Sequence, residues 1–442
     1  MLRWFAALSL LFGLVLPQIA RAQAASGSFS HIYIIMEENS SYEDLIGNTA
    51  DAPYINYLAN TYGFAANYYG VTHPSMPNYI AATAGQFFSH SDNPSQVFDA
   101  TNIVDQLDAA GKTWAAYMQS MPSVGFTGQG YPAGGAALYV NKHNPFVLYK
   151  DILDSPERLS NDKPASMLAS DLASGTAPNY VWISPDVCHD MHGMPSSDAI
   201  ADGEPWCAYP PNFVLSHPLI QQADSYLKTL VTTIMSSPAW TSDSAIVVTW
   251  DENESSGATN ANLGYASGTG CCSSPPGLGG GRVPAIVITS SPNHAVSLHP
   301  YNHYSLLRTV EDNLGLPCLA NTCNADVHPM TDLFPPAGSS VPLSQLGGVA
   351  VTFSSTNPGQ GMVLFGSGPG CEGLIETATR DVSAGTTQHT VLVQGDDFAP
   401  QGMDIGLTPG ATYWYEAITS TPEGEEVDNN NGKCYTFTMT TP

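Results

Sequence analysis

A serine stands where the sequence predicts the start of a helix. The stretch from Thr72 to Tyr79 places Ser75 just before Pro77, and proline suits a first helical turn because it needs no N–H there. That turn leaves amide groups unpaired and carries partial positive charge, so it can receive a phosphate. Ser75 is then a candidate nucleophile, and Asn78 can offer an amide to a phosphoryl oxygen. A plain helix-capping serine is the alternative for this stretch alone.

Acidic residues and histidines follow several short apolar runs that are typical of buried strands. The runs His31–Met36, Tyr180–Ile183 and Ala245–Trp250 lead into polar segments. Ligands of open α/β sheets sit beyond the carboxyl ends of the strands, so we expect these segments to meet. They carry Glu38 and Asn39, then Asp190 and His192, then Asp251 and Glu252, while His303 precedes a predicted helix over 304–314.

Carboxylates that converge in this way repel one another unless a cation neutralises them. Glu38, Asn39, Asp251 and Glu252 offer only oxygen, which favours Ca²⁺, Mg²⁺ or Mn²⁺ over Zn²⁺. The second set, Asp190, His192 and His303, mixes nitrogen and oxygen. It is a candidate for a second, softer metal ion or for proton donors to a leaving group.

Strand and helix patterns alternate as far as residue 316 and then stop. This predicts an α/β fold with a largely parallel sheet sandwiched by helices. We expect a signal peptide over 1–24, a catalytic domain over 28–335 and a Pro/Gly/Ser-rich linker over 336–348. The remainder, 349–442, has short Thr- and Val-rich runs between turns and predicts a small all-β C-terminal sandwich.

The charge balance and the cysteines narrow the class of protein. Of the 442 residues, 12 are Lys or Arg and 39 are Asp or Glu, so the formal charge is -27 and nucleic acid is not an expected partner. The apolar run over 4–16 is too short for a bilayer span, and no other long apolar segment predicts a transmembrane anchor. Export permits disulfides among the eight cysteines. We expect Cys188–Cys207, Cys318–Cys323 and Cys371–Cys434, and separate partners for the adjacent Cys271 and Cys272.

Several motifs in order resemble the phosphoesterase family of secreted acid phosphatases and bacterial phospholipases C, within the alkaline-phosphatase-like superfamily. They are Glu38-Asn39-x-Ser-Tyr42, Thr72-His-Pro-Ser75-x-Pro-Asn78-Tyr79, Lys142-His-Asn-Pro-Phe146, Pro185-x-x-x-x-Asp190-Met-His192 and Thr249-Trp-Asp251-Glu252. One departure is that Asp251-Glu252 stands where the two-zinc enzymes of the superfamily typically carry Asp-His. Another is Asp186, where asparagine is commoner in the family.

The C-terminal region resembles a fibronectin type III module, which implies a spacer or a docking contact with a cell surface or polymer.

The resemblance implies metal-assisted transfer of a phosphoryl group through a phospho-serine at Ser75. It implies metal ligation by Glu38, Asn39, Asp251 and Glu252, and phosphate binding by Asn78. Lys142 and His143 become candidate phosphate contacts, and His73 is explained equally well as a phosphate contact or as a loop residue. Asp190, His192 and His303 would form the other half of the site.

The expected function is therefore hydrolysis of small phosphate monoesters by an exported acid phosphatase. A phosphodiesterase or phospholipase C using the same site is the first alternative. A non-catalytic secreted binding or adhesion protein is the alternative from another class. A sulfatase is disfavoured because the C/S-x-P-x-R pattern is missing from the sequence.

Overall fold

The computed structural model describes most of the chain, in thirteen stretches. They are residues 29–133, 136–201, 203–209, 217–253, 270–274, 279–290, 295–334, 349–371, 374, 376–378, 386–393, 410–421 and 424–438. The predicted signal peptide over 1–24 and the predicted linker over 336–348 lie outside these residues. No helix in this part of the chain combines the length and the apolar character needed to cross a bilayer.

The larger unit is built on one sheet, whose strands follow the order β10-β2-β9-β8-β1-β7-β3-β6, with β11 beside β2. Its described pairings are parallel except those of β9, which runs antiparallel to β2 and β8. The predicted largely parallel sheet is confirmed. The strands are β1 (His31–Glu37), β2 (Gly63–Tyr69), β3 (Trp114–Met118), β6 (Asp162–Pro164), β7 (Tyr180–Ser184), β8 (Ser244–Trp250), β9 (Arg282–Thr289), β10 (Val296–Ser297) and β11 (Tyr301–Asn302).

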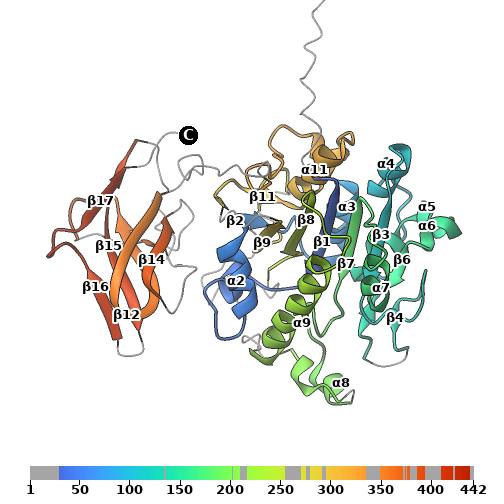
Figure 1. Cartoon of the computed structure of the whole chain (residues 1–442), viewed down its shortest axis with the longest axis horizontal. Coiled ribbons are helices and arrows are strands. Elements are labelled where there is room, and N and C mark those ends of the chain that lie inside the picture. Colours follow the sequence, from blue (N-terminus) through green and yellow to red (C-terminus); the bar gives the residue numbers. More distant parts are fainter. Residues whose placement is uncertain are drawn as a thin grey trace, which may run out of the picture.

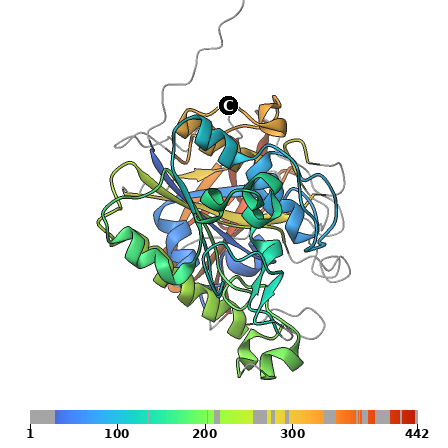
Figure 2. The ribbon, with the colours of Figure 1, turned by 90° about the vertical axis from the view of Figure 1, so that its right-hand side faces the viewer.

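Helices cover both faces of this sheet, as Figures 1 and 2 show with α11 and α9 on opposite sides. On one side α3 packs against α11, and elsewhere α2 packs against α9. The helices are α1 (Tyr42–Leu45), α2 (Pro53–Thr61), α3 (Ser75–Ala84), α4 (Ile103–Ala109), α5 (Lys150–Leu153), α6 (Pro156–Leu159), α7 (Leu168–Leu172), α8 (Ser196–Ala201), α9 (His217–Met235) and α11 (His303–Leu314).

The central strands form where the sequence has continuous apolar runs. Every residue of β8 is buried, and so is every residue of β1 after His31. Strands that are covered on both faces by helices need this composition, because neither face meets water. A short hairpin of β4 (Gly130–Tyr131) and β5 (Tyr139–Val140) lies outside the main sheet.

The C-terminal residues form a separate antiparallel sheet with its own small core (Figure 1). Its order is β13-β12-β15-β16, with β14 beside β12 and β17 beside β15. The fibronectin type III resemblance stays a prediction, because the pairings establish only an antiparallel β unit. The strands are β12 (Val349–Gly366), β13 (Glu376–Ala378), β14 (Thr386–Val393), β15 (Thr412–Thr421), β16 (Gly424–Asp428) and β17 (Tyr435–Thr438).

The cysteines form the three expected disulfides, Cys188–Cys207, Cys318–Cys323 and Cys371–Cys434. The expectation for the adjacent pair was wrong, because Cys271 is joined to Cys272. Each of the other cysteines is already paired, so no other thiol was left for these two.

Candidate active site

The segments that follow β1 and β8 are brought together by the register of these two parallel strands. Met36 of β1 lies beside Thr249 of β8, and Glu37 lies beside Trp250. Both strands end there, and the Asp251 amide donates to the Glu37 carbonyl at 3.0 Å. Glu38 and Asp251 therefore leave the sheet side by side, and both side chains are fully buried.

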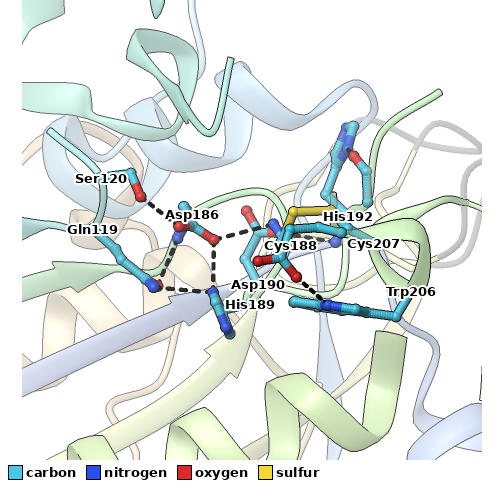
Figure 3. The surroundings of a disulfide bond; sticks show 11 residues. Gln119, Ser120, Asp186, Cys188, His189, Asp190, His192, Trp206 and Cys207 are labelled. Carbon is cyan, nitrogen blue, oxygen red and sulfur yellow. Dashed lines mark hydrogen bonds and ion pairs between the residues drawn. A yellow bond between two sulfur atoms is a disulfide. The ribbon is translucent and has the colours of Figure 1, made fainter. Parts of the chain in front are cut away.

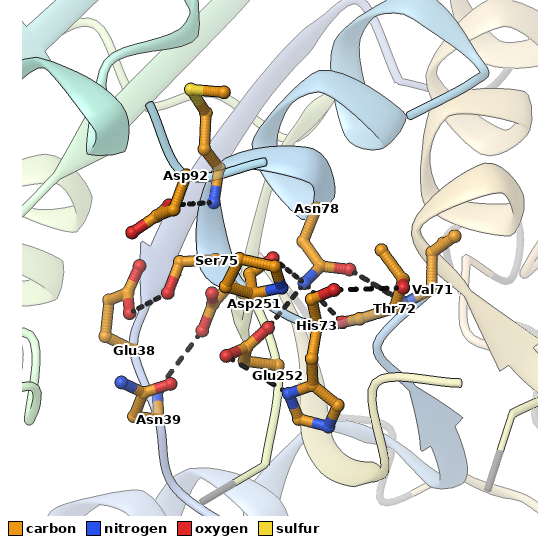
Figure 4. A network of polar contacts seen from close by, with 12 residues as sticks. Glu38, Asn39, Val71, Thr72, His73, Ser75, Asn78, Asp92, Asp251 and Glu252 are labelled. Carbon is orange, nitrogen blue, oxygen red and sulfur yellow. Dashed lines mark hydrogen bonds and ion pairs between the residues drawn. The ribbon is translucent and has the colours of Figure 1, made fainter. Parts of the chain in front are cut away.

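Ser75 is the first residue of α3 and points into this carboxylate cluster (Figure 4). Its hydroxyl donates a hydrogen bond of 3.0 Å to Glu38 Oε2, and the residue is only 3% exposed. The sequence predicted both the helix start and this neighbourhood. The arrangement places a hydroxyl oxygen at a positive helix end and next to an acceptor for its proton, as a nucleophile would require.

Glu252 faces the loop before α3 rather than Ser75. Glu252 Oε1 lies 3.1 Å from His73 Nδ1, and Oε2 accepts a hydrogen bond of 2.9 Å from the Asn78 amide. The Asn78 amide also donates to the Thr72 carbonyl at 2.7 Å, and its oxygen accepts from the Val71 and Thr72 amides. Asn78 thus shapes the nucleophile loop from within, and its predicted contact with phosphate stays a prediction.

A third strand end supplies Asp190, and His143 links it to Glu38. The Glu38 amide donates to the Asp190 carbonyl at 2.7 Å, which fixes the two segments together. His143 Nδ1 lies 3.1 Å from Asp190 Oδ2, and its Nε2 lies 3.1 Å from Glu38 Oε1. The His143 ring stacks on Tyr79 with centroids 5.4 Å apart, which holds the imidazole between the two carboxyl groups.

His192 completes this side of the site. Its ring centroid is 5.5 Å from that of His143, and its amide donates to Asp190 Oδ1 at 2.7 Å. One donor atom each from Glu38, His143 and His192 lies within 4.8 Å of the other two, so these residues could hold a metal ion. The structure therefore puts His143, predicted as a phosphate contact, next to a candidate cation position.

His303 occupies a different place from the one expected. Its Nε2 lies 2.5 Å from the Asp251 carbonyl oxygen and its Nδ1 lies 3.0 Å from the Tyr68 hydroxyl. Both ring nitrogens therefore contact protein atoms. Among the described residues, Asp190, His192 and His303 do not form a group whose ligand atoms lie close enough together to bind one metal ion. His303 instead fixes the backbone that carries Asp251.

Lys142 brings a positive charge to the acidic site. Its Nζ forms an ion pair of 2.6 Å with Asp92, which also accepts a hydrogen bond of 3.1 Å from the Met76 amide at the start of α3. Burial would lower the pKa of Lys142, but the charges of Asp92 and Glu38 outweigh it and raise that pKa. Lys142 is thus held as a cation beside the nucleophile helix.

Unpaired buried oxygen atoms test whether a cation fits the oxygen-rich side. Among the described residues, Asn39 Oδ1 and Asp251 Oδ2 are buried and accept no hydrogen bond. Buried polar atoms are normally paired, and carboxylate and amide oxygens are ligands of Ca²⁺, Mg²⁺ and Mn²⁺. The residues present therefore fit a divalent cation between Glu38, Asn39 and Asp251.

Burial and mutual repulsion raise the pKa values of three carboxyl groups in the site. Burial, followed by the charge of Asp251, raises the pKa of Glu38 well above its usual value. Burial and then Glu252 raise the pKa of Asp251, while burial and then Glu38 raise that of Asp190. A bound cation would favour the charged forms of all three groups.

Asp186 organises the loop that carries Asp190 and His192 (Figure 3). It accepts hydrogen bonds from Ser120 at 2.6 Å and from the Cys188 amide at 3.2 Å, and it pairs with His189 at 2.9 Å. The Cys188–Cys207 disulfide pins the same loop. The role of Asp186, left open by the sequence, is to hold the loop in place.

Two contributors carry no clear signal in the sequence. Asp92 sits in a loop after α3, where an acidic residue is unremarkable, yet it pairs with Lys142. Tyr79 belongs to α3 and reads as an ordinary core residue, yet it stacks on His143. The partners in each pair lie far apart in the sequence, and only the tertiary fold brings them together.

A buried hydroxyl at a helix start, beside carboxylates that fit a cation, is an arrangement that can transfer acyl or phosphoryl groups. The profile of the Phosphoesterase family matches residues 48–317, which is more than half of the chain. The chain belongs to the Phosphoesterase family.

Relatives of known description agree with this assignment. A probable acid phosphatase of Kluyveromyces lactis is 28% identical over 296 residues, or 66% of this chain, and the match spans 60% of that protein's length. A phosphatidylinositol-3-phosphatase of Mycobacterium tuberculosis is 28% identical over 320 residues, which cover 72% of this chain and 87% of that protein.

Among solved structures, a protein of the alkaline phosphatase superfamily from Vibrio parahaemolyticus aligns with 95% of this chain and 84% of its own. The TM-score is 0.41 and the sequence identity is 10%.

Proposed function

We propose that this protein is an exported acid phosphatase that hydrolyses phosphate monoesters, with Ser75 as the nucleophile. The observation that carries the proposal is the 3.0 Å hydrogen bond from Ser75 to Glu38 at the start of α3, inside a buried cluster with unpaired oxygen atoms. Membership of the Phosphoesterase family supports the same reaction class.

The reaction has two steps in this proposal. The Ser75 oxygen forms a bond to phosphorus, the ester P–O bond breaks, and the alcohol leaves with a proton. Water then cleaves the phospho-serine and releases phosphate. The amide groups at the start of α3 and the charge of Lys142 attract the phosphoryl oxygens. Both nitrogens of His303 are engaged elsewhere, so we assign the leaving-group proton to His192. Its Nδ1 lies 2.7 Å from the Gly193 carbonyl oxygen and burial lowers its pKa to about 4, so it gives this proton from Nε2, in acid and only while it does not bind an ion.

Glu38, Asn39 and Asp251 would hold a divalent cation. Glu252, the fourth predicted ligand, follows Asp251 in the sequence, and its carboxylate contacts His73 and Asn78. When bound, such a cation neutralises phosphate charge and lowers the pKa of a nearby hydroxyl. The oxygen donors favour Ca²⁺, Mg²⁺ or Mn²⁺, and the mixed set of Glu38, His143 and His192 is the candidate for a second ion.

The choice of monoester rests on charge and on relatives. A dianionic phosphate gains most from a cation site together with Lys142, and the names of both relatives describe phosphatases. The four disulfides fit an oxidising compartment, which together with the predicted signal peptide supports export. Contact of the C-terminal unit with a cell surface or polymer stays a prediction.

The test compares an aryl phosphate monoester with the matching diester, on purified protein, from acidic to neutral pH and with each cation added. We expect monoester turnover that is strongest in acid and is lost in Ser75→Ala. Turnover of the diester alone would replace the proposal with a phosphodiesterase or phospholipase C. Absence of Ser75-dependent turnover of both substrates would favour the non-catalytic binding protein.

A further inference from the structure

A surface pocket of about 610 Å³ lies between α2 and α9 and shares no residue with the candidate active site. Ligand sites commonly measure roughly 300–1,000 Å³, so its size is that of a binding site. The two helices pack side by side (Figure 1). The pocket is lined by Ala50, Asp51, Pro53, Tyr54, Tyr57, Gln221, Asp224, Ser225 and Lys228.

Two stacked tyrosines form the apolar wall of this pocket. Tyr54 and Tyr57 are three residues apart on α2, so they share one helix face, and their rings stack with centroids 5.8 Å apart. Tyr57 is 53% exposed, the highest value for a Phe, Tyr or Trp residue among the described residues. An exposed flat ring with a polar hydroxyl suits a ligand that is apolar on one face and polar at its edge.

The position of the tyrosines is fixed by a buried carboxylate from the other helix. Asp224 of α9 accepts hydrogen bonds from the Tyr54 amide at 3.0 Å and from the Ile55 amide at 2.8 Å. These amides belong to the unpaired first turn of α2, so Asp224 caps that helix from outside. The aromatic wall is therefore preorganised, which lowers the entropy lost on binding.

The charges of the pocket are mixed and favour a neutral ligand over a strongly charged one. Asp51 and Asp224 disfavour an anion, and Lys228, whose Nζ lies 5.9 Å from the Tyr54 ring centre, disfavours a cation. Asp51 is already paired with His217 at 2.5 Å and Gln221 at 2.8 Å. The side chains of Gln221, Ser225 and Lys228 include both donors and acceptors.

We propose that this pocket binds a neutral carbohydrate, with a sugar ring on Tyr57 and its hydroxyl groups on the polar side chains of α9. A pyranose ring offers an apolar C–H face and a rim of hydroxyl groups, which matches the tyrosine wall and the donors and acceptors beside it. The site would hold the enzyme on a glycan while the catalytic site acts independently.

The test is calorimetric titration of the full chain with cellohexaose, maltohexaose and hexa-N-acetylchitohexaose, each up to about 10 mM. We expect at least one to bind, Tyr57→Ala to weaken that binding at least about tenfold, and Tyr57→Phe to keep it within about twofold. Tyr131→Ala, which removes a tyrosine 43% exposed outside this pocket, is the matched control and should bind normally.

Three results would overturn the proposal. They are the failure of all three sugars to bind, unchanged binding in Tyr57→Ala, and tighter binding of an anionic oligogalacturonate than of any neutral sugar. Turnover of a soluble phosphate ester should be the same in Tyr57→Ala as in the unmodified protein. That readout keeps the carbohydrate site separate from the proposed phosphatase activity.

Discussion

The protein buries carboxyl groups in two very different settings. At the ends of β1 and β8, Glu38 and Asp251 lie together, and Asp251 Oδ2 accepts no hydrogen bond within the described residues. In the last turn of α11, Glu311 is equally buried, but Thr322 donates to it at 2.7 Å and Gln106 at 3.4 Å. Burial raises the pKa of all three groups.

The comparison shows that a raised pKa alone does not mark a functional site. Burial keeps Glu311 neutral although Thr322 and Gln106 donate to its two oxygens, so both oxygens are paired within the protein. Glu38 and Asp251 are close together with an acceptor left unpaired, which is the pattern that a cation completes. The unpaired oxygen atoms, not the pKa values, distinguish the candidate active site from the buried acid of α11.

The largest expected effect comes from removing the nucleophile of the first setting. Ser75→Ala should lower kcat/KM for an aryl phosphate by at least about 10³, because alanine has no oxygen with which to form the covalent bond. Steady-state kinetics measure this, with Ser170→Ala on the exposed face of α7 as the control. A variant that kept a tenth of the activity or more would break the assignment of Ser75.

Replacing the carboxylate of Asp251, which carries the unpaired oxygen, should affect cation binding, whereas replacing that of Glu311 should not. Asp251→Asn should weaken the affinity for the activating cation by about 100-fold, whereas Glu311→Gln should leave it unchanged. Activity titrated against Mg²⁺, Ca²⁺ and Mn²⁺ after chelation, with the bound metal measured by elemental analysis, gives both values. Equal loss in the two variants would remove the distinction that we draw.

His303 sharpens the comparison because it acts on Asp251 only through its backbone. His303→Ala should lower kcat about tenfold by releasing the Asp251 carbonyl, and His303→Gln should restore part of it by donating to the same oxygen. The loss should be the same for aryl phosphates with good and poor leaving groups. A loss that grew with the pKa of the leaving group would instead make His303 the proton donor.

The smallest effect concerns the stability that Glu311 controls. Burial, partly offset by Thr322 and Gln106, raises the pKa of Glu311 to about 8. The unfolded chain loses this proton near its usual pKa of 4.5, so between about pH 4.5 and 8 the folded state holds more protons and its stability falls as the pH rises.

Glu311→Gln keeps a neutral hydrogen-bonding group and removes the titration. It should therefore stabilise the protein by about 4 kcal/mol near pH 8 and by less than about 1 kcal/mol near pH 5. Urea unfolding at the two pH values measures the difference, with the exposed Asp154→Asn as the control. A gain that did not depend on pH would contradict a proton held by Glu311.

The sequence predicted the elements that meet at the active site. Apolar runs predicted the bounds of β1, β7 and β8 to within a residue. The polar residues after β1 and β8 meet because parallel strands present their carboxyl ends at one edge. The antiparallel direction of β9 was not predictable, since an apolar run looks the same in either direction.

The side-chain partners could not be read from local patterns. In the sequence, the short helical turn that carries His143 does not follow any strand of the main sheet directly. Its position between Glu38 and Asp190 therefore depends on how that segment folds back onto the sheet. His303 follows the expected helix start, but the direction of its ring is set by Tyr68 on β2. The sequence therefore supported the location of the site better than the role of each histidine.

The assignment of Ser75 as the nucleophile can be tested by trapping the covalent intermediate. The protein is mixed with an aryl phosphate monoester, quenched in acid within milliseconds to seconds and digested, and the peptide that contains Ser75 is analysed by mass spectrometry. Our account predicts phosphate on Ser75, absent without substrate and absent in Ser75→Ala. Rapid turnover with no phosphate on Ser75 at any quench time would contradict it.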